Sequence, residues 1–334
     1  MPLWFGLSAC KPAAPKKQVV VYSPHGQEIL DEFGAAFHAA HPDIEFVGRF
    51  VSPLQVLSQL RIDTRSPKID VWWGGTSAFF SQGVAENLLQ PYRPSWADAS
   101  KTEYHDAKDF WYAQFLQVPA VMFNSNIYKV EDIPKSWAEL LDPKWKDKIV
   151  IREPMDSGTM KTIYSGIIWR LGGAEHKSDA GYDFLKKLDA QTKSYLPNPQ
   201  ALYDRIGKSS EGYISLWNVT DIIFQAKANG YPFGFRVFED PVPLSVDPIG
   251  IIAGAPHSEE AKLFYEFVTS KENCVKLAKE HYRILARTDI SKDDLPAEMN
   301  AIQFQPMDIS FEAFDKLQNE WMETWRKTIR NPEK

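Results

Sequence analysis

The sequence is poor in cysteine, lacks a long apolar run and carries no excess of basic residues. Its 334 residues include two cysteines, Cys10 and Cys274, which are too few to make a zinc site by themselves. No apolar stretch approaches the length of a membrane span. The formal net charge of −6 gives none of the basic footprint typical of nucleic-acid-binding proteins. We therefore expect neither a transmembrane helix nor a nucleic-acid partner.

The sequence also lacks the common catalytic signatures. It contains no Gly-x-Ser-x-Gly, no phosphate-binding Walker loop and no His-Glu-x-x-His motif. His38 and His41 lie three residues apart at a predicted helix end, but no third metal ligand accompanies them. We therefore expect no enzymatic activity, no cofactor and no resident metal.

What remains is the composition of an ordinary globular protein of one large domain or two. Hydrophobic residues make up 44% and charged residues 25% of the chain. Aromatic residues reach 13%, with 11 tryptophans. Such residues fill a core, but they also make flat walls for a small-molecule cleft.

The N-terminal segment resembles a bacterial lipobox. Leu7, Ser8 and Ala9 precede Cys10, and a Pro-, Ala- and Lys-rich stretch follows it. We interpret residues 1–17 as a signal remnant, lipobox and tether, with lipid on Cys10. Cys274 would then be left alone, without an internal disulfide, as a small buried residue of a helix.

The first part of the chain alternates strands and helices, which predicts an α/β fold with a parallel sheet. The predicted strands are 18–22, 44–50 and 69–73, and the predicted helices are 27–40 and 53–62. The alternation resumes later with strands at 117–123, 148–151, 212–217 and 249–253 and helices at 137–141, 159–171, 182–188, 201–206, 221–228, 259–269, 271–281 and 311–329. Residues 91–109 have weak periodicity and are expected to run over the surface.

Loops at the carboxyl ends of these strands are the candidate ligand-binding segments, because α/β sheets bind ligands there. Ser23 and His25 precede the first helix, where they suit an anionic group, although Ser23 could equally cap the helix. The paired glycines Gly74 and Gly75 allow close backbone approach to a ligand, and Thr76 or Ser77 can cap the following helix, although the segment could equally be a plain turn. Trp73 is expected to line the cleft while Trp72 faces the core.

A second group of candidates comes later in the chain. Ser157, Gly158 and Thr159 open a helix and form a predicted anion cradle. Trp217 and Asn218 end a strand and suit an organic solute, as a flat wall and a two-way hydrogen-bonding group. Asp247 precedes Pro248 and is expected either to accept hydrogen bonds from the solute or to form a turn.

The order of these motifs resembles the extracellular solute-binding proteins of ABC importers. The resemblance runs from about residue 19 to residue 278 and is to the ferric-binding-protein-like branch of family 1, in periplasmic binding protein class II. The segments that carry it are Tyr22–Gly26, Asp70–Thr76, Pro119–Asn124, Ser157–Thr159, Asp247–Ile252 and, most specific, Ile133–Ile149 with its Pro-Lys-Ser-Trp and Trp-Lys-Asp-Lys-Ile sequences.

The resemblance implies two lobes joined by a hinge of crossing strands, with solute held between them. Lobe one would comprise residues 18–118 plus 253–334, and lobe two residues 119–252. It also implies delivery of the solute to an inner-membrane permease. Together with the lipobox, it leads us to expect a lipid-anchored monomer in the periplasm or at the cell surface. In this family the Ser-Gly-Thr loop often holds a phosphate, a carboxylate or a synergistic anion.

The chain departs from its relatives at the expected iron site. Ferric-binding members place two adjacent tyrosines near the position of Trp217, and this chain has no Tyr-Tyr pair. We therefore predict a small organic anion, phosphorylated or a phosphonate, as solute. Two alternatives stay open: a ferric or other metal complex, for which Tyr22, His25, Tyr203 or Tyr213 could supply ligands, and a sensory protein that docks on a receptor kinase.

Overall fold

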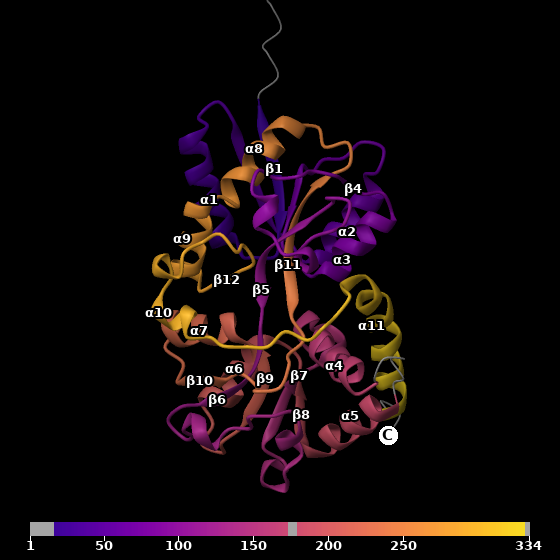
Figure 1. Ribbon diagram of the computed structural model, residues 1–334, viewed down its shortest axis with the longest axis vertical. Helices are drawn as coiled ribbons and strands as arrows, with labels where there is room; N and C mark the ends of the chain where they lie inside the picture. The colour runs from indigo at the N-terminus through magenta and orange to yellow at the C-terminus, as the bar shows by residue number, and fades with distance from the viewer. Residues whose placement is uncertain (1–16, 173–178, 331–334) are drawn as a thin grey trace, which may run out of the picture.

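Two β-sheets, one above the other in Figure 1, organise the chain. This computed structural model describes residues 17–172 and 179–330, so Cys10 and most of the predicted tether lie outside the described residues. Helices flank each sheet, which confirms the predicted two-lobe α/β architecture. Within the described ranges, no helix combines the length and the apolar character that a membrane crossing requires.

The upper half in Figure 1, lobe one, is built on a seven-stranded sheet. Its strands are β1 (Gln18–Ser23), β2 (Glu45–Phe50), β3 (Val71–Trp73), β4 (Leu89–Gln90), β5 (Tyr112–Gln117), β11 (Ser245–Ile252) and β12 (Ile284–Leu285). They run in the order β12-β5-β11-β3-β1-β2, with β4 paired to β11. The helices of this lobe are α1 (Gln27–Ala40), α2 (Pro53–Ile62), α3 (Ser77–Ala85), α8 (Ser258–Val268) and α9 (Lys271–His281).

The lower half, lobe two, is built on a five-stranded sheet in the order β10-β6-β9-β7-β8. Its strands are β6 (Pro119–Asn124), β7 (Ile149–Arg152), β8 (Thr192–Leu196), β9 (Ile214–Asn218) and β10 (Phe233–Arg236). Its helices are α4 (Gly158–Leu171), α5 (Asp179–Gln191), α6 (Pro199–Gly207) and α7 (Val219–Ala228). The chain ends with the short α10 (Ala297–Asn300), the longer α11 (Phe311–Trp325) and a terminal helical turn, Arg326–Arg330.

Local sequence signals explain where the first helices begin. α2 starts with Pro53 after Ser52, and Ser52 and Gln55 form a capping box that satisfies free N–H groups at the helix start. In α1, the side chains of Ile29, Leu30 and Phe33 are buried at helical spacing. Cys274 of α9 is fully buried, as predicted for a small apolar residue.

The two lobes are joined by crossing strands. β5 ends at Gln117 in lobe one and β6 begins at Pro119 in lobe two, so the chain crosses at Val118. The return falls between β10 and β11, because β11 pairs with β5, β3 and β4 of lobe one. Residues 245–252 thus lie in the sheet of lobe one, whereas the predicted boundary counted them with lobe two. An apolar run indicates a buried strand, but it does not indicate which strands pair with it.

The C-terminal helix also differs from the predicted division, which counted it with lobe one alone. α11 packs against both α4 of lobe two and α3 of lobe one. On the lobe-two side, the Trp325 ring meets Tyr164 edge to face at a centroid distance of 5.2 Å. The Trp169 indole N–H of α4 also donates to the Asp308 carbonyl oxygen just ahead of α11. This helix therefore spans the lobe boundary.

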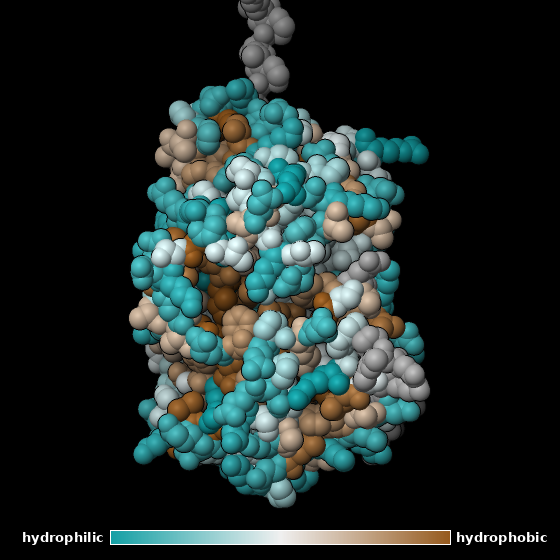
Figure 2. Space-filling view, in the orientation of Figure 1, coloured by the Kyte–Doolittle hydropathy of each residue, from teal (hydrophilic) through white to brown (hydrophobic). Residues whose placement is uncertain are grey.

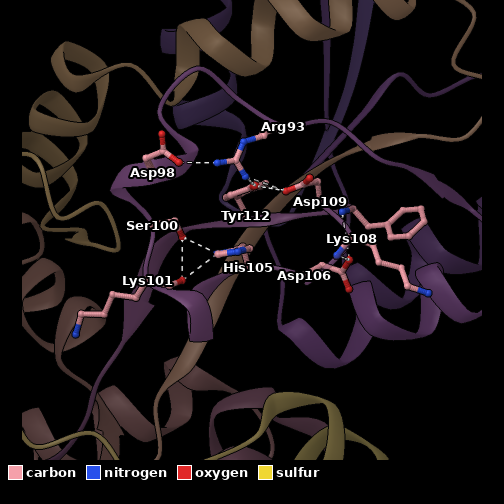
Figure 3. A network of polar contacts seen from close by, with 10 residues as sticks. Arg93, Asp98, Ser100, Lys101, His105, Asp106, Lys108, Asp109 and Tyr112 are labelled. Atoms are coloured by element: carbon pink, nitrogen blue, oxygen red, sulfur yellow. Dashed lines mark hydrogen bonds and ion pairs between the residues drawn. The ribbon is translucent and has the colours of Figure 1, made fainter.

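Residues 91–109, expected to run over the surface, are tied to the start of β5 by a polar network (Figure 3). The Tyr112 hydroxyl donates a hydrogen bond to Asp109, and the Arg93 guanidinium lies 3.6 Å from the same carboxylate. The His105 ring stacks on Tyr112 with a centroid distance of 4.8 Å. The loop is thereby fixed against one of the crossing strands.

A buried carboxylate connects three elements of lobe one. Asp70, at the start of β3, is fully buried and accepts the backbone N–H of Val20 in β1 at 2.7 Å. It also accepts the backbone N–H of His257 at 2.9 Å, and the His257 ring Nδ1 lies 3.0 Å away. Asp70 thus links β1, β3 and the segment that leads into α8.

Replacing Asp70 should destabilise lobe one strongly. Asp70→Ala leaves the N–H donors of Val20 and His257 buried without an acceptor, and breaking a buried polar network of this kind costs about 3–5 kcal/mol. Urea unfolding followed by circular dichroism measures the loss. Asp43→Ala is the control, because Asp43 forms an exposed ion pair with Lys17 and should leave the midpoint nearly unchanged. Equal midpoints for the two variants would contradict this role of Asp70.

Candidate functional site

The N-termini of helices from both lobes meet at the lobe boundary. β1 and β3 are neighbouring parallel strands, so the loops that lead into α1 and α3 leave the same edge of the sheet. α4 of lobe two begins opposite them: a Cβ atom placed on Gly158 would lie 3.5 Å from Cγ2 of Thr76. In Figure 1, α3 and α4 face each other across this boundary. Figure 2 shows hydrophobic side chains gathered in a hollow at about the same height, toward the left of the molecule and away from these two helices.

On the lobe-one side, four predicted residues form one network. The His25 side chain is 4% exposed, and its Nε2 atom lies 3.0 Å from Oδ1 of Asp247. The same carboxylate oxygen accepts the backbone N–H of Gly75 at 3.2 Å. Ser23 Oγ accepts the backbone N–H of His25 at 3.1 Å. The Nδ1 atom of His25 is buried without a hydrogen-bond partner among the described residues, so the network retains one unused polar atom.

A β-bulge in β11 positions the Asp247 carboxylate. The register between β11 and β5 shifts between Asp247 and Pro248. The Pro248 carbonyl oxygen then accepts the N–H of Gly74 at 2.8 Å. Bulges re-aim side chains at sheet positions of this kind. The crossing strand therefore holds the loop after β3 through both its backbone and the neighbouring carboxylate.

On the lobe-two side, the start of α4 carries free donors. Ser157 is buried, and its Oγ accepts the N–H of Met160 at 3.2 Å, as an N-cap does. The Ser157 carbonyl oxygen accepts the N–H of Lys161. Among the described residues, no protein acceptor is recorded for the N–H groups of Gly158 and Thr159. The predicted anion cradle therefore presents backbone donors, while the Ser157 hydroxyl is used for capping.

The two tryptophans predicted at the cleft lie in the cores. Trp73 is fully buried, and its indole N–H donates to Gln114 Oε1 at 2.7 Å. Trp217 is 4% exposed, and its indole N–H donates to the Tyr203 hydroxyl at 3.2 Å. Neither ring offers an exposed wall in this arrangement, because each strand end is covered by helices. The Trp73 ring instead packs edge to face against the His25 ring, with a centroid distance of 4.9 Å.

Asn218 has a capping role at the start of α7. Its side-chain oxygen accepts the N–H of Asp221 at 2.9 Å, and its amide nitrogen donates to the Asp221 carboxylate at 2.8 Å. The Val219 N–H is also used, since it donates to the Val118 carbonyl oxygen at the crossing point. The contact of Asn218 with solute stays a prediction.

The side chains named as possible metal ligands have other partners. Burial raises the pKa of the Tyr203 phenol well above its usual range, which disfavours the phenolate that iron requires. The hydroxyl of Tyr213 donates to Glu211, and the guanidinium of Arg49 lies over the ring of Tyr22.

A separate cluster of possible metal-binding groups lies between α1 and α9. It consists of Glu32, Glu280 and His281. The ammonium group of Lys276 lies 2.6 Å from Glu32, and His281 Nε2 lies 2.7 Å from the other oxygen of Glu32. The cluster is therefore an ion-pair network that joins two helices of lobe one.

The structure adds residues that the sequence analysis missed. A small hollow beside Thr76 is lined by residues of α3, α4, α11 and the start of β11. Its polar lining residues are Ser77, Thr162, Ser245, Asp315 and Gln318, and its apolar ones are Ala78, Leu244, Phe311 and Phe314. Burial raises the pKa of the Asp315 carboxyl to about 7. Its place on α11, more than 200 residues from α3 in the chain, leaves no local signal in the sequence.

The sequence is similar to those of bacterial solute-binding proteins. Residues 66–301 match the sequence profile described as "Bacterial extracellular solute-binding protein". A probable ABC transporter periplasmic-binding protein of Sinorhizobium fredii is 24% identical over 93% of this chain and 86% of its own length. A putative 2-aminoethylphosphonate-binding periplasmic protein of Salmonella typhimurium is 24% identical over 72% of this chain and 68% of its own length.

Solved structures share the fold. AfuA from Actinobacillus pleuropneumoniae, solved with fructose-6-phosphate bound, aligns with a TM-score of 0.76 and 21% identity, over 94% of this chain and 99% of that one. Iron-bound HitA from Pseudomonas aeruginosa aligns with a TM-score of 0.78 and 19% identity, over 93% and 99%. The same architecture thus carries different solutes.

Gly74 should not tolerate a side chain. Its φ of 104° suits glycine, and a Cβ atom there would lie 2.4 Å from Nε2 of His25. Gly74→Ala should therefore displace His25 from Asp247 and lower the unfolding midpoint. Gly26→Ala is the matched control, because Gly26 has a φ of 100° but no atom within 4 Å of the new Cβ.

Backbone strain alone should cost Gly26→Ala roughly 1–3 kcal/mol. In Gly74→Ala the steric clash with His25 adds to that cost. The thermal unfolding midpoint of Gly74→Ala should therefore be lower than that of Gly26→Ala. The ¹⁵N resonances of the His25 ring should shift further in Gly74→Ala than in Gly26→Ala, because only the new Cβ atom at position 74 contacts the ring. An unchanged His25 spectrum in that variant would contradict the packing described here.

Proposed function

Because this chain belongs to the family of bacterial extracellular solute-binding proteins, we propose that it is the receptor of an ABC importer that captures a small organic anion. The solute carries a phosphate or phosphonate group, sits between the two lobes and passes to an inner-membrane permease. The protein works as a monomer and performs no chemistry on its solute. A phosphorylated or phosphonate solute agrees with the names of a relative and a structural neighbour.

The observation that carries this proposal is the meeting of two helix N-termini from different lobes. Gly158 at the start of α4 lies against Thr76 at the start of α3. Helix N-termini present unpaired N–H groups and partial positive charge, which together favour an anionic oxygen group. An anion held there would contact both lobes at once without needing a lysine or arginine.

Closure of the lobes follows from this arrangement. Donors of α3 and α4 converge on one anion only when the lobes are together, so the anion stabilises the closed state over an open one. Val118 and the segment between β10 and β11 cross the boundary and are the natural hinge positions. Binding should therefore make the protein more compact.

The ferric alternative is supported less well. Iron-bound HitA shares the fold, but at this identity the likeness extends to the fold alone. Tyr203 of this chain is buried and accepts a hydrogen bond from the indole of Trp217, which is also buried. Hard ferric iron prefers anionic oxygen ligands, which an indole does not supply.

The anion cradle is tested by removing one N–H group. Gly158 is the first residue of α4, where proline is tolerated, and the extended backbone of Ser157 suits a following proline. Gly158→Pro deletes a donor to the anion, and a hydrogen bond to a charged group is worth about 1.5–3 kcal/mol. The affinity for the best-binding phosphate or phosphonate compound should fall roughly ten- to a hundred-fold.

Gly158→Ala is the matched control. It keeps the N–H group, and its Cβ makes an ordinary contact with Thr76 at 3.5 Å, so it should bind almost as the native protein does. Calorimetry with inorganic phosphate, alkylphosphonates, sugar phosphates and ferric citrate supplies the affinities. Equal affinities for the proline and alanine variants would refute the cradle. A visible charge-transfer band with ferric citrate that is lost in Tyr203→Phe would favour iron instead.

We further propose that the protein is held at a membrane surface by lipid on Cys10. This residue ends the Leu-Ser-Ala-Cys sequence, and the following stretch is too polar to pack into a core. Such an anchor would keep the receptor near its permease on the outer side of the inner membrane. A single site of attachment and a tether leave both lobes free to move.

The anchor is tested by metabolic labelling. Produced in a bacterium behind a functional signal peptide, the native chain should incorporate labelled palmitate and partition into detergent. Cys10→Ser should abolish both, whereas Cys274→Ser should leave labelling intact, since Cys274 is buried in α9. Label retained in Cys10→Ser would show that this anchor is wrong.

A further inference from the structure

Helix α11 brings an acidic side chain to the lobe boundary. Its C-terminal end is fixed on lobe two, where the ring of Trp325 contacts Tyr164 and lies 5.9 Å from the ring of Tyr195. Its N-terminal half reaches α3 of lobe one, where Ser81 Oγ donates to the Asp315 carboxylate at 3.4 Å. Asp315 is therefore placed beside the helix whose N-terminus forms one side of the proposed anion site.

Asp315 has a hydroxyl partner but no cationic one. Ser81 of α3 donates a hydrogen bond to it, and Ser77, one turn earlier on the same helix, lines the same hollow. Within residues 17–172 and 179–330, no lysine, arginine or histidine forms an ion pair with it. Partial burial without a counter-charge raises the pKa of its carboxyl to about 7. A positively charged group placed next to Asp315 would favour its carboxylate form and would be attracted to it.

The carboxylate faces a hollow suited to an ammonium group. The hollow is small: about 10 Å³ is accessible to the centre of a water-sized group, which is the room that one water molecule or one ammonium head needs. Thr162 of α4, Ser245 of β11 and Gln318 of α11 line it together with Asp315, and each carries an oxygen that can accept a hydrogen bond. An ammonium group has three donors to satisfy, whereas a divalent metal ion would need more anionic oxygens than one carboxylate supplies.

The hollow adjoins the proposed anion site through Thr76, which lines the hollow and also lies against Gly158. We propose that Asp315 receives an amino group of the solute, so that the captured compound is a zwitterion with its anionic end at the N-termini of α3 and α4. This inference rests on the proposed function and deepens it by naming the class of solute, an ω-amino phosphonate or phosphate. The two charged ends would lie a few bonds apart.

The test compares matched compounds with and without the amino group. Isothermal calorimetry measures the affinities of aminomethyl-, 2-aminoethyl- and 3-aminopropylphosphonate against methyl-, ethyl- and propylphosphonate. A charge-assisted hydrogen bond should make the best amino compound bind roughly ten- to a hundred-fold more tightly than its counterpart. Asp315→Asn, which keeps the shape of the side chain, should reduce this ratio to about one while leaving the affinity for the alkylphosphonate nearly unchanged.

Glu320→Gln is the control variant, since it removes one negative charge from an exposed position of the same helix and should keep the full preference. A native protein that binds both compounds of a pair equally overturns the zwitterion inference and leaves the anion proposal standing. If Asp315→Asn still prefers the amino compounds over the alkylphosphonates, the inference is also overturned. The role of Asp315 is then only to link α11 to α3. If no phosphonate of either series binds, this inference fails; the proposed function fails as well only if inorganic phosphate and the sugar phosphates also do not bind.

Discussion

The antiparallel pairing of β5 with β11 is the constraint on which the two-lobe arrangement depends. These strands lie side by side in the sheet of lobe one, and each continues into or returns from lobe two. Their register places the bulge at Asp247 and Pro248 directly beside the loop after β3. β11, which returns the chain from lobe two, therefore also orders His25 and Gly75 at the candidate site.

The groups proposed to bind the two charges of the solute are backbone N–H groups and one carboxylate. The donors proposed to hold the anion are backbone N–H groups at helix starts, which neither titrate nor move independently of their helices. The acceptor proposed to hold a cation is Asp315, a single carboxylate that α11 carries to lobe one from its main packing site on lobe two. A solute with both charges would therefore join α3, α4 and α11, and these three helices span both lobes.

Several predicted site residues lie together, although their contact with solute stays a prediction. The rule that ligands bind beyond the carboxyl ends of strands led to Ser23, His25 and Gly75, and the structure brings them together with Asp247, which was chosen for its place near the return crossing. It also led to Trp73 and Trp217, whose rings are buried because helices cover both faces of their sheets. Alternation along a strand tells two faces apart, but it cannot say which face is open to solvent.

The sequence by itself determined the α/β class, the bounds of α1, α2 and α9 and the loops where solute should bind, because periodicity and capping are local signals. Only the tertiary structure decided that β11 belongs to lobe one, that α11 spans both lobes and that Asp315 lies beside α3. These features arise from contacts between residues far apart in the chain. Their energies depend on strand pairing and side-chain packing, which no local pattern encodes.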